Sequence, residues 1–279
     1  MDAFWIILTG TLVAGSCALV GSFLILKKMT MVGDAISHAV LPGIVIAYFV
    51  AGSLQSVWLL IGAGSLGLLT TFLIEFFHQK GKLQTDASIG VTFTWLFALG
   101  VILVSYYSGN AHIDQDCVLH GEIVYVPIDM VFSKSGTPIM PRSVLITGIV
   151  FIIVALFILL FYKELLLTTF DSLFANAIGI STSTWHYLLM GLVSLTTVAS
   201  FESVGAILVV AFLIAPAASA YLLTQDLKKM LILALLFGFT SAFGGYYLAV
   251  ILDSSIAGAM VTVAGFIFLI CYLAIVLRK

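Results

Sequence analysis

The sequence predicts an all-α integral membrane protein that crosses the bilayer many times as a polytopic helical bundle. Hydrophobic residues make up 62% of the 279 residues and charged residues only 9%, and the mean hydropathy is +1.23. A water-soluble domain of this length needs more polar surface than such a composition can supply. Because a spanning helix needs about 20 apolar residues, the chain has room for many spans and little else.

Hydropathy along the chain predicts about nine spans, or eight if one short segment does not cross. The apolar segments lie at about 4–26, 36–52, 56–77, 88–107, 144–162, 185–200, 203–223, 230–251 and 256–277. The segments at 36–52 and 185–200 are short and could be half-buried or broken. No internal repeat and no second domain is visible, so we expect residues 1–279 to form a single transmembrane domain.

The basic residues predict the orientation, because Lys and Arg are more frequent in cytoplasmic loops. With the N-terminus outside and the C-terminus inside, only Lys134 and Arg142 of the eleven basic residues lie outside. On this topology residues 108–143 form an extracellular loop, and residues 164–184 form a cytoplasmic segment. The net charge of −2 is too small to indicate nucleic acid as a partner.

Sequence motifs argue against an enzyme. No Walker A loop, H-E-x-x-H pair or G-x-S-x-G turn is present in the sequence, so nucleotide hydrolysis by that route is excluded. The string GAGSLG at 62–67 matches a dinucleotide-binding pattern by letter. It lies within an apolar span rather than between a strand and a helix, which favours helix packing.

The strongest candidate site is GDAISHAVLPG at 33–43, with Asp34 and His38 four positions apart. On a helix these side chains share one face, and ionisable residues in spans indicate functional sites. A carboxylate and an imidazole suit a divalent first-row metal. Pro42 has no N–H to offer the carbonyl of His38. The alternative is that Asp34 caps the helix while His38 bonds to a neighbouring helix.

Weaker candidates lie elsewhere in the chain. Glu202, near an outer turn, could line an entrance, and Pro216 could kink its span or break a pore-lining helix. An exposed outer loop is normally polar, so its acidic and imidazole groups have at most a weak role in attracting cations. These loop residues are His112, Asp114, Asp116 and His120.

The inner segment TTFDSLFANAIGIST predicts a short helix from Asp171 to Ala177 that ends at Gly179. It carries few charges for a cytoplasmic segment, so its apolar side chains need to be shielded from water. It could lie on the membrane surface as an amphipathic helix or dock against a cytoplasmic protein.

Three stretches resemble the permease subunits of the metal-uptake ABC transporters for manganese, zinc and iron. GDAISHAVLPGIVIAYF is similar to the second span of that family, and SVGAILVVAFLIAPAASAYLL to its late proline-containing span. FDSLFANAIGIST resembles its ATPase-contacting coupling helix, with the pattern D-x-x-x-A-x-x-x-G at Asp171, Ala175 and Gly179. The resemblance covers nearly the whole chain.

The resemblance implies a type II importer permease in a bacterial plasma membrane, working as a homodimer. It implies two cytoplasmic ATPase subunits that hydrolyse the ATP and an extracellular metal-binding lipoprotein that delivers the ion. Asp34 and His38 match the proposed translocation site, and the ion is transported cargo rather than a permanent cofactor. The string His-Ala-Val-Leu-Pro-Gly is more like manganese and iron members than zinc members, and oxygen ligands suit Mn²⁺.

The predicted topology places Asp34 near the inner end of its span, whereas transporter sites usually lie near the midplane. Either the 27–33 segment dips into the membrane, or the pair belongs to the inner part of the path. The rival function is an ion-coupled secondary transporter that uses the same two residues without an ATPase.

Overall fold

The computed structural model describes residues 2–51, 56–107, 123–132 and 138–277. Within these ranges the chain is overwhelmingly helical, as the composition predicts. The long helices are α1 (Asp2–Leu26), α4 (Ser56–Gln79), α5 (Thr85–Tyr107), α7 (Arg142–Leu160), α10 (Thr182–Val204), α11 (Ala206–Leu223), α12 (Leu227–Leu252) and α13 (Ile256–Val276). The shorter helices are α2 (Met31–Ala39), α3 (Leu41–Ala51), α8 (Tyr162–Phe170), α9 (Ser172–Ala177) and the 3₁₀ turn Ile123–Tyr125.

In the part of the chain that the structure describes, nine helical segments are long and apolar enough to cross a membrane. Each overlaps one of the nine predicted apolar segments, so the expected span count is confirmed. The chain is a multi-pass membrane protein.

The two short predicted segments behave differently. The second span, Met31–Val50, consists of α2 followed by α3, with a break at Val40. By contrast, α10 is a full span of 23 residues. Its first turns carry Ser, Thr and His, which lowered the local hydropathy and made the span look short.

A small antiparallel hairpin is the one departure from helix within the described residues. Strand β1 (Met130–Phe132) pairs with β2 (Pro138–Pro141), placing Val131 opposite Met140. The hairpin lies in the predicted outer loop, just before α7, and it adds no layer to the bundle.

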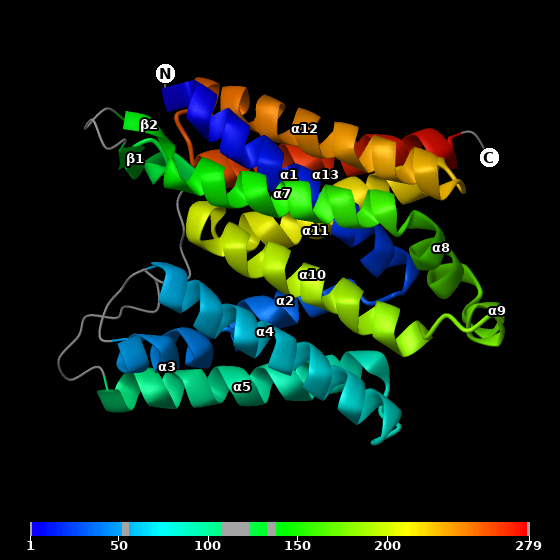
Figure 1. Ribbon diagram of the computed structural model, residues 1–279. Helices are drawn as coiled ribbons and strands as arrows, with labels where there is room; N and C mark the ends of the chain where they lie inside the picture. The colour runs from blue at the N-terminus through cyan, green and yellow to red at the C-terminus, as the bar shows by residue number, and fades with distance from the viewer. Residues whose placement is uncertain (1, 52–55, 108–122, 133–137, 278–279) are drawn as a thin grey trace.

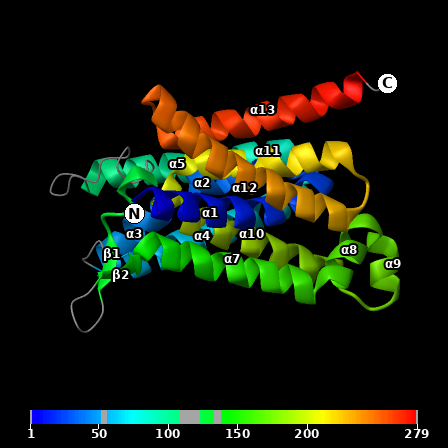
Figure 2. The same ribbon diagram turned by 90° about the horizontal axis from the view of Figure 1, so that it is seen from above.

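The helices form two groups with α10 between them (Figure 1). One group contains α2 to α5, and the other contains α1, α7 and α11 to α13; α10 contacts α4 and α2 on one side and α1 and α7 on the other. Seen from above, α1 lies between α7 and α12 (Figure 2). We call the end that carries β1 and β2 the hairpin end, and the opposite end the α9 end.

The basic residues gather at the α9 end of the bundle. The connections from α1 to α2, from α4 to α5, from α7 through α8 and α9 to α10, and from α11 to α12 all lie there. Within the described residues, these connections and the helix starts beside them hold Lys27, Lys28, Lys80, Lys82, Lys163, Lys228 and Lys229. The predicted clustering of positive charge at one end is therefore confirmed.

Candidate functional site

Asp34 and His38 lie together on one face of α2, as their spacing predicts. The Nε2 of His38 is 3.6 Å from Oδ1 of Asp34, and the side chains are 41% and 43% exposed. The opposite face of α2 is buried, with Ala35 and Ile36 in the protein core. An exposed ionisable pair in an apolar bundle must face protein, water or a substrate rather than lipid.

Asp34 does not cap α2, so that alternative is wrong. The N-cap position is Thr30, which has helical backbone angles and makes no side-chain cap bond, while Asp34 is the fourth residue of the helix. His38 lies instead against aromatic rings of α5. Its ring centroid is 6.1 Å from that of Phe93 and 5.9 Å from that of Phe97.

The pair lies level with the middle of the neighbouring spans. A β-carbon placed on Gly67 would overlap the Oγ of Ser194 and lie 3.4 Å from Cγ2 of Ile36. Gly67 is the twelfth of 24 residues in α4, and Ser194 is the thirteenth of 23 in α10. Ile36 sits between Asp34 and His38, so all three lie at mid-depth.

Asp34 is the fourth residue of the span Met31–Val50, so it lies near the end of its span as predicted, but the span itself begins inside the bundle. The span begins at Met31, five residues before Ile36, whereas α4 continues twelve residues past Gly67 toward the α9 end. At 1.5 Å per residue, α2 starts about 10 Å inside the bundle relative to the end of α4. Of the two explanations left open by the sequence, the inward dip of the chain before α2 is the one that the structure supports.

A pocket of about 150 Å³ opens beside Asp34, between α2 and α5. Its lining residues are Met31, Asp34, Ala35, Asp86, Ile89, Gly90 and Phe93. Asp86 is the second residue of α5, so the pocket extends from Asp34 toward the α9 end. Sequence reasoning missed Asp86, although its position in the first turn of a span could have marked it.

Pro42 and Pro216 both lie within spans, where a proline interrupts the helical hydrogen bonds. Pro42 is the second residue of α3, just after the break, where the carbonyl of Val40 accepts hydrogen bonds from the N–H groups of Gly43 and Ile44. Pro216 is buried inside α11, which continues through it as one helix. Both remain candidates for the pathway.

Glu202 does not join the pair. It lies eight residues beyond Ser194 on α10, toward the hairpin end, which corresponds to about 12 Å along the helix. Just after it, Gly205 adopts a φ of +80° and turns the chain into α11. The predicted loop candidates His112, Asp114, Asp116 and His120 lie outside the described residues.

The predicted short helix from Asp171 to Ala177 is confirmed as α9. Asp171 is its N-cap, and its carboxylate accepts a hydrogen bond of 2.9 Å from the N–H of Phe174. Gly179 has a φ of +87°, and the N–H groups of Gly179 and Ile180 bond to the carbonyls of Asn176 and Ala175. This pattern is a Schellman motif, which requires a residue that tolerates positive φ.

The side chains of α9 divide into a buried anchor and an exposed apolar surface. Ala175 is fully buried, whereas Leu173 is 83% exposed. Phe174 of α9 is also exposed, as are the flanking Phe170 at the end of α8 and Ile178 just after α9. Exposed apolar side chains gathered on and beside a short helix indicate a surface that another protein or the membrane covers.

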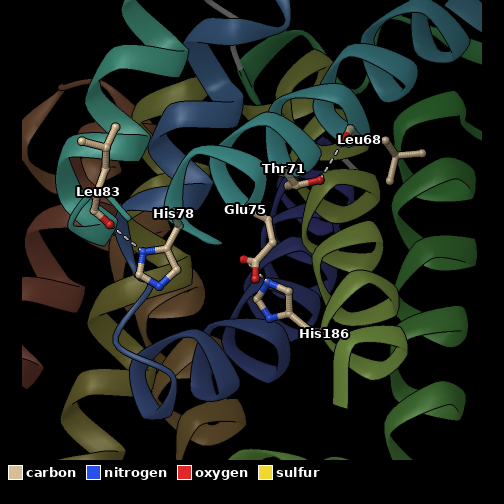
Figure 3. A network of polar contacts seen from close by, with 6 residues as sticks. All are labelled: Leu68, Thr71, Glu75, His78, Leu83 and His186. Atoms are coloured by element: carbon tan, nitrogen blue, oxygen red, sulfur yellow. Dashed lines mark hydrogen bonds and ion pairs between the residues drawn. The ribbon is translucent and has the colours of Figure 1, made fainter. Parts of the chain in front are cut away.

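A second ionisable pair, which sequence reasoning missed, joins α4 to α10. The Nε2 of His186 lies 3.0 Å from Oε2 of Glu75, and the side chains are only 15% and 10% exposed (Figure 3). Burial lowers the pKa of nearby Lys27 from its ordinary value, and the negative charge of Glu75 opposes that shift. The signal in the sequence was a carboxylate and an imidazole in two separate apolar segments.

Neither pair amounts to a closed metal site by itself. Among the described residues, no group of three or more His, Cys, Asp and Glu side chains is placed to hold an ion. A bundle of apolar spans with a half-exposed ionisable pair at mid-depth, open to a pocket, is the architecture of a membrane transport protein.

Comparison with known proteins agrees with this class. The model of the ABC 3 transport family matches residues 3–275, and the chain therefore belongs to that family. It is 50% identical over 268 residues to the "Manganese transport system membrane protein MntD" of Bacillus subtilis (strain 168), covering 96% of this chain and 89% of the relative. It is 43% identical to the "Zinc transport system membrane protein TroD" of Treponema pallidum (strain Nichols), covering 96% and 72%.

A solved structure has the same fold. A chain of "PsaBC from Streptococcus pneumoniae in complex with Fab" aligns with a TM-score of 0.77 and 35% identity, covering 96% of this chain and 90% of that one. The protein is thus a polytopic membrane permease of the ABC transporter type.

Proposed function

We propose that the protein is the permease subunit of an ATP-driven importer that moves a divalent transition metal, Mn²⁺, into the cell. The observation that carries this proposal is the Asp34–His38 pair, which lies at mid-depth in an apolar bundle and has a pocket beside Asp34. A carboxylate oxygen and an imidazole nitrogen are suitable ligands for such an ion.

The incompleteness of the site suits transport. A site that moves an ion must bind it tightly enough to accept it and weakly enough to release it. Two donor residues from one chain hold a divalent cation only transiently, and water or a second copy of the chain completes the coordination. Asp34 and His38 are then ligands during passage, and Pro42, Pro216 and Glu202 belong to the surrounding pathway.

The partners follow from the same proposal. The exposed apolar side chains of α9 support docking to a cytoplasmic ATPase, with Asp171, Ala175 and Gly179 shaping the docking helix. Residues 164–184 are then the cytoplasmic coupling segment, and 108–143 the extracellular loop beneath a metal-binding lipoprotein. The N-terminus lies outside and the C-terminus inside the bacterial plasma membrane, and ATP is hydrolysed in the partner.

Zn²⁺ and Fe²⁺ are the alternative substrates, since the zinc-named relative is also similar across nearly the whole chain. An ion-coupled secondary transporter would use the same pair without an ATPase. The apolar surface of α9 favours the ATP-driven importer, because a secondary transporter has no need for a docking helix.

The test is metal uptake by the permease reconstituted with its ATPase and binding protein, with radiolabelled Mn²⁺ competing against Zn²⁺ and Fe²⁺. We expect ATP-dependent uptake that unlabelled Mn²⁺ suppresses most strongly. Asp34→Ala and His38→Ala are expected to abolish uptake while the complex still assembles. Normal uptake by both variants would overturn the site, and uptake without the ATPase would favour the secondary transporter.

A further inference from the structure

Helix α9 is linked to α10 by two hydrogen bonds. The Oδ1 of Asn176 accepts hydrogen bonds from the N–H of Thr182 at 3.3 Å and from its hydroxyl at 3.2 Å. Together with the Schellman motif that ends α9, these bonds leave little freedom between the two helices. A displacement of α9 is therefore passed to the first turn of α10.

His186 lies in that part of α10, as the fifth residue of the helix. Its imidazole meets the carboxylate of Glu75, near the α9 end of α4, with both side chains almost buried (Figure 3). A second contact lies toward the hairpin end. Gly67, eight residues before Glu75 on α4, comes close to Ser194, eight residues after His186 on α10. The two contacts are about 12 Å apart and fix one antiparallel register between α4 and α10.

Helix α4 in turn holds the span that carries the candidate metal ligands. Gly67 lies against Ile36, between Asp34 and His38. Near the hairpin end, Gly62 packs closely against Gly43 of α3, where a β-carbon on either glycine would meet the backbone of the other. A shift of α4 along its axis therefore displaces α2 and α3.

Stability alone does not account for a Glu–His pair at this position. Well-packed apolar residues of similar volume stabilise a helix interface as well as a buried ion pair does, or better. In some proteins a buried polar group sets one register between two helices, which apolar side chains alone leave open. Register between α4 and α10 is the property that a transmitted displacement requires.

We propose that Glu75 and His186 are positioning residues that transmit the movement of α9 to α2, the helix that bears Asp34 and His38. This inference rests on the proposed function, because it takes α9 as the ATPase-docking helix. It adds a mechanical role for two residues that are not part of the Asp34–His38 pair. The pair connects α10 to the group of helices that contains α2 to α5.

The test measures coupling in the complete transporter, with permease, ATPase and binding protein in proteoliposomes. Metal uptake and ATP hydrolysis are recorded together for Glu75→Gln, His186→Gln, the double variant and the exchanged pair Glu75→His with His186→Glu. His78→Gln is the matched control, since His78 lies three residues from Glu75 on α4 and bonds instead to the carbonyl of Leu83 at 2.9 Å.

We expect each single variant to assemble and hydrolyse ATP while the number of ions moved per ATP falls about tenfold, within the usual range of coupling energies. The double variant should move about as many ions per ATP as either single variant, because each single substitution already removes the same connection. The exchanged pair should recover most of the ratio, and His78→Gln should keep the wild-type ratio.

The inference is overturned if Glu75→Gln and His186→Gln keep the wild-type ratio of ions to ATP. It is also overturned if uptake and hydrolysis fall in proportion, because a purely structural role lowers the amount of working complex without changing the ratio. Failure of the proposed function looks different: the wild-type complex would then show no ATP-dependent uptake of metal at all.

Discussion

The imidazole of His38 meets the ring of Phe97 edge to face, with the ring centroids 5.9 Å apart. Phe97 is the thirteenth of the 23 residues of α5, so this contact places His38 beside the middle of a span. Edge-to-face packing also restricts the orientations open to the imidazole. Phe97 therefore helps to hold the nitrogen of His38 near the carboxylate of Asp34.

Replacing Phe97 should weaken transport without removing a ligand. In Phe97→Ala the imidazole gains rotational freedom, and we expect uptake to fall about two- to tenfold, the equivalent of a lost aromatic pair. Phe97→Leu keeps most of the side-chain volume and should lie between Phe97→Ala and the wild type. Initial uptake rates across a range of metal concentrations provide the measurement, and unchanged rates in Phe97→Ala would contradict this role.

Asp86 should affect the release of the ion rather than its capture. Its carboxylate lines the same pocket as Asp34, on the side toward the α9 end, and a negative charge there attracts a cation that leaves the pair. We expect Asp86→Asn to lower the maximal uptake rate about two- to tenfold, as expected for losing one charge at close range in a partly solvated site.

The concentration of metal at half-maximal uptake should change little in Asp86→Asn. Asp253→Asn is a suitable control, because Asp253 is an exposed residue that follows α12 at the hairpin end and Asn tolerates its positive φ of 48°. If Asp86→Asn instead raised the half-maximal concentration at an unchanged maximal rate, the pocket would belong to the entry side.

The number of spans and the Asp34–His38 pair could be predicted because both depend on local signals. Apolar runs of sufficient length define spans, and a spacing of four places two side chains on one helical face. The exposed helix α9, with its cap at Asp171 and its glycine at 179, was predictable for the same reason. Each of these features is complete within a few turns of chain.

The depth of the pair and the Glu75–His186 contact could not be predicted in this way. Where α2 starts relative to α4 depends on how residues 27–30 pack, and hydropathy does not report that packing. Glu75 and His186 lie far apart in the chain, so their contact follows from the antiparallel register of α4 and α10. Such a register is a property of tertiary packing rather than of either helix alone.

The close approach of α4 and α10 predicts that the stability of the permease falls steeply as the side chain at position 67 becomes larger. A β-carbon there would overlap the Oγ of Ser194, so we expect Gly67→Ala to destabilise the permease by about 1–3 kcal/mol, as is usual for overpacking. Gly64→Ala is the matched control, because a β-carbon at Gly64 meets nothing within 4 Å. Thermal unfolding of the purified permease in detergent should separate the two variants.

A second substitution tests whether the overlap with Ser194 is the cause. The Oγ of Ser194 is buried and, within the described structure, makes no hydrogen bond, so Ser194→Ala removes the overlapping atom at little cost. We expect the double variant Gly67→Ala with Ser194→Ala to recover much of the lost stability. If the double variant were as unstable as Gly67→Ala alone, the close approach of α4 and α10 would not explain the effect.

The cap of α9 should control how well the permease holds its ATPase. In Asp171→Ala the bond from the N–H of Phe174 is lost, which typically costs a helix about 1 kcal/mol. In a helix of six residues this loss should fray the turn that presents Leu173 and Phe174. We therefore expect the affinity for the ATPase to fall about fivefold, as 1 kcal/mol implies. Asp171→Ser restores a capping oxygen and should bind the ATPase nearly as well as the wild type, so weak binding by both variants would mean that the carboxylate contacts the ATPase directly.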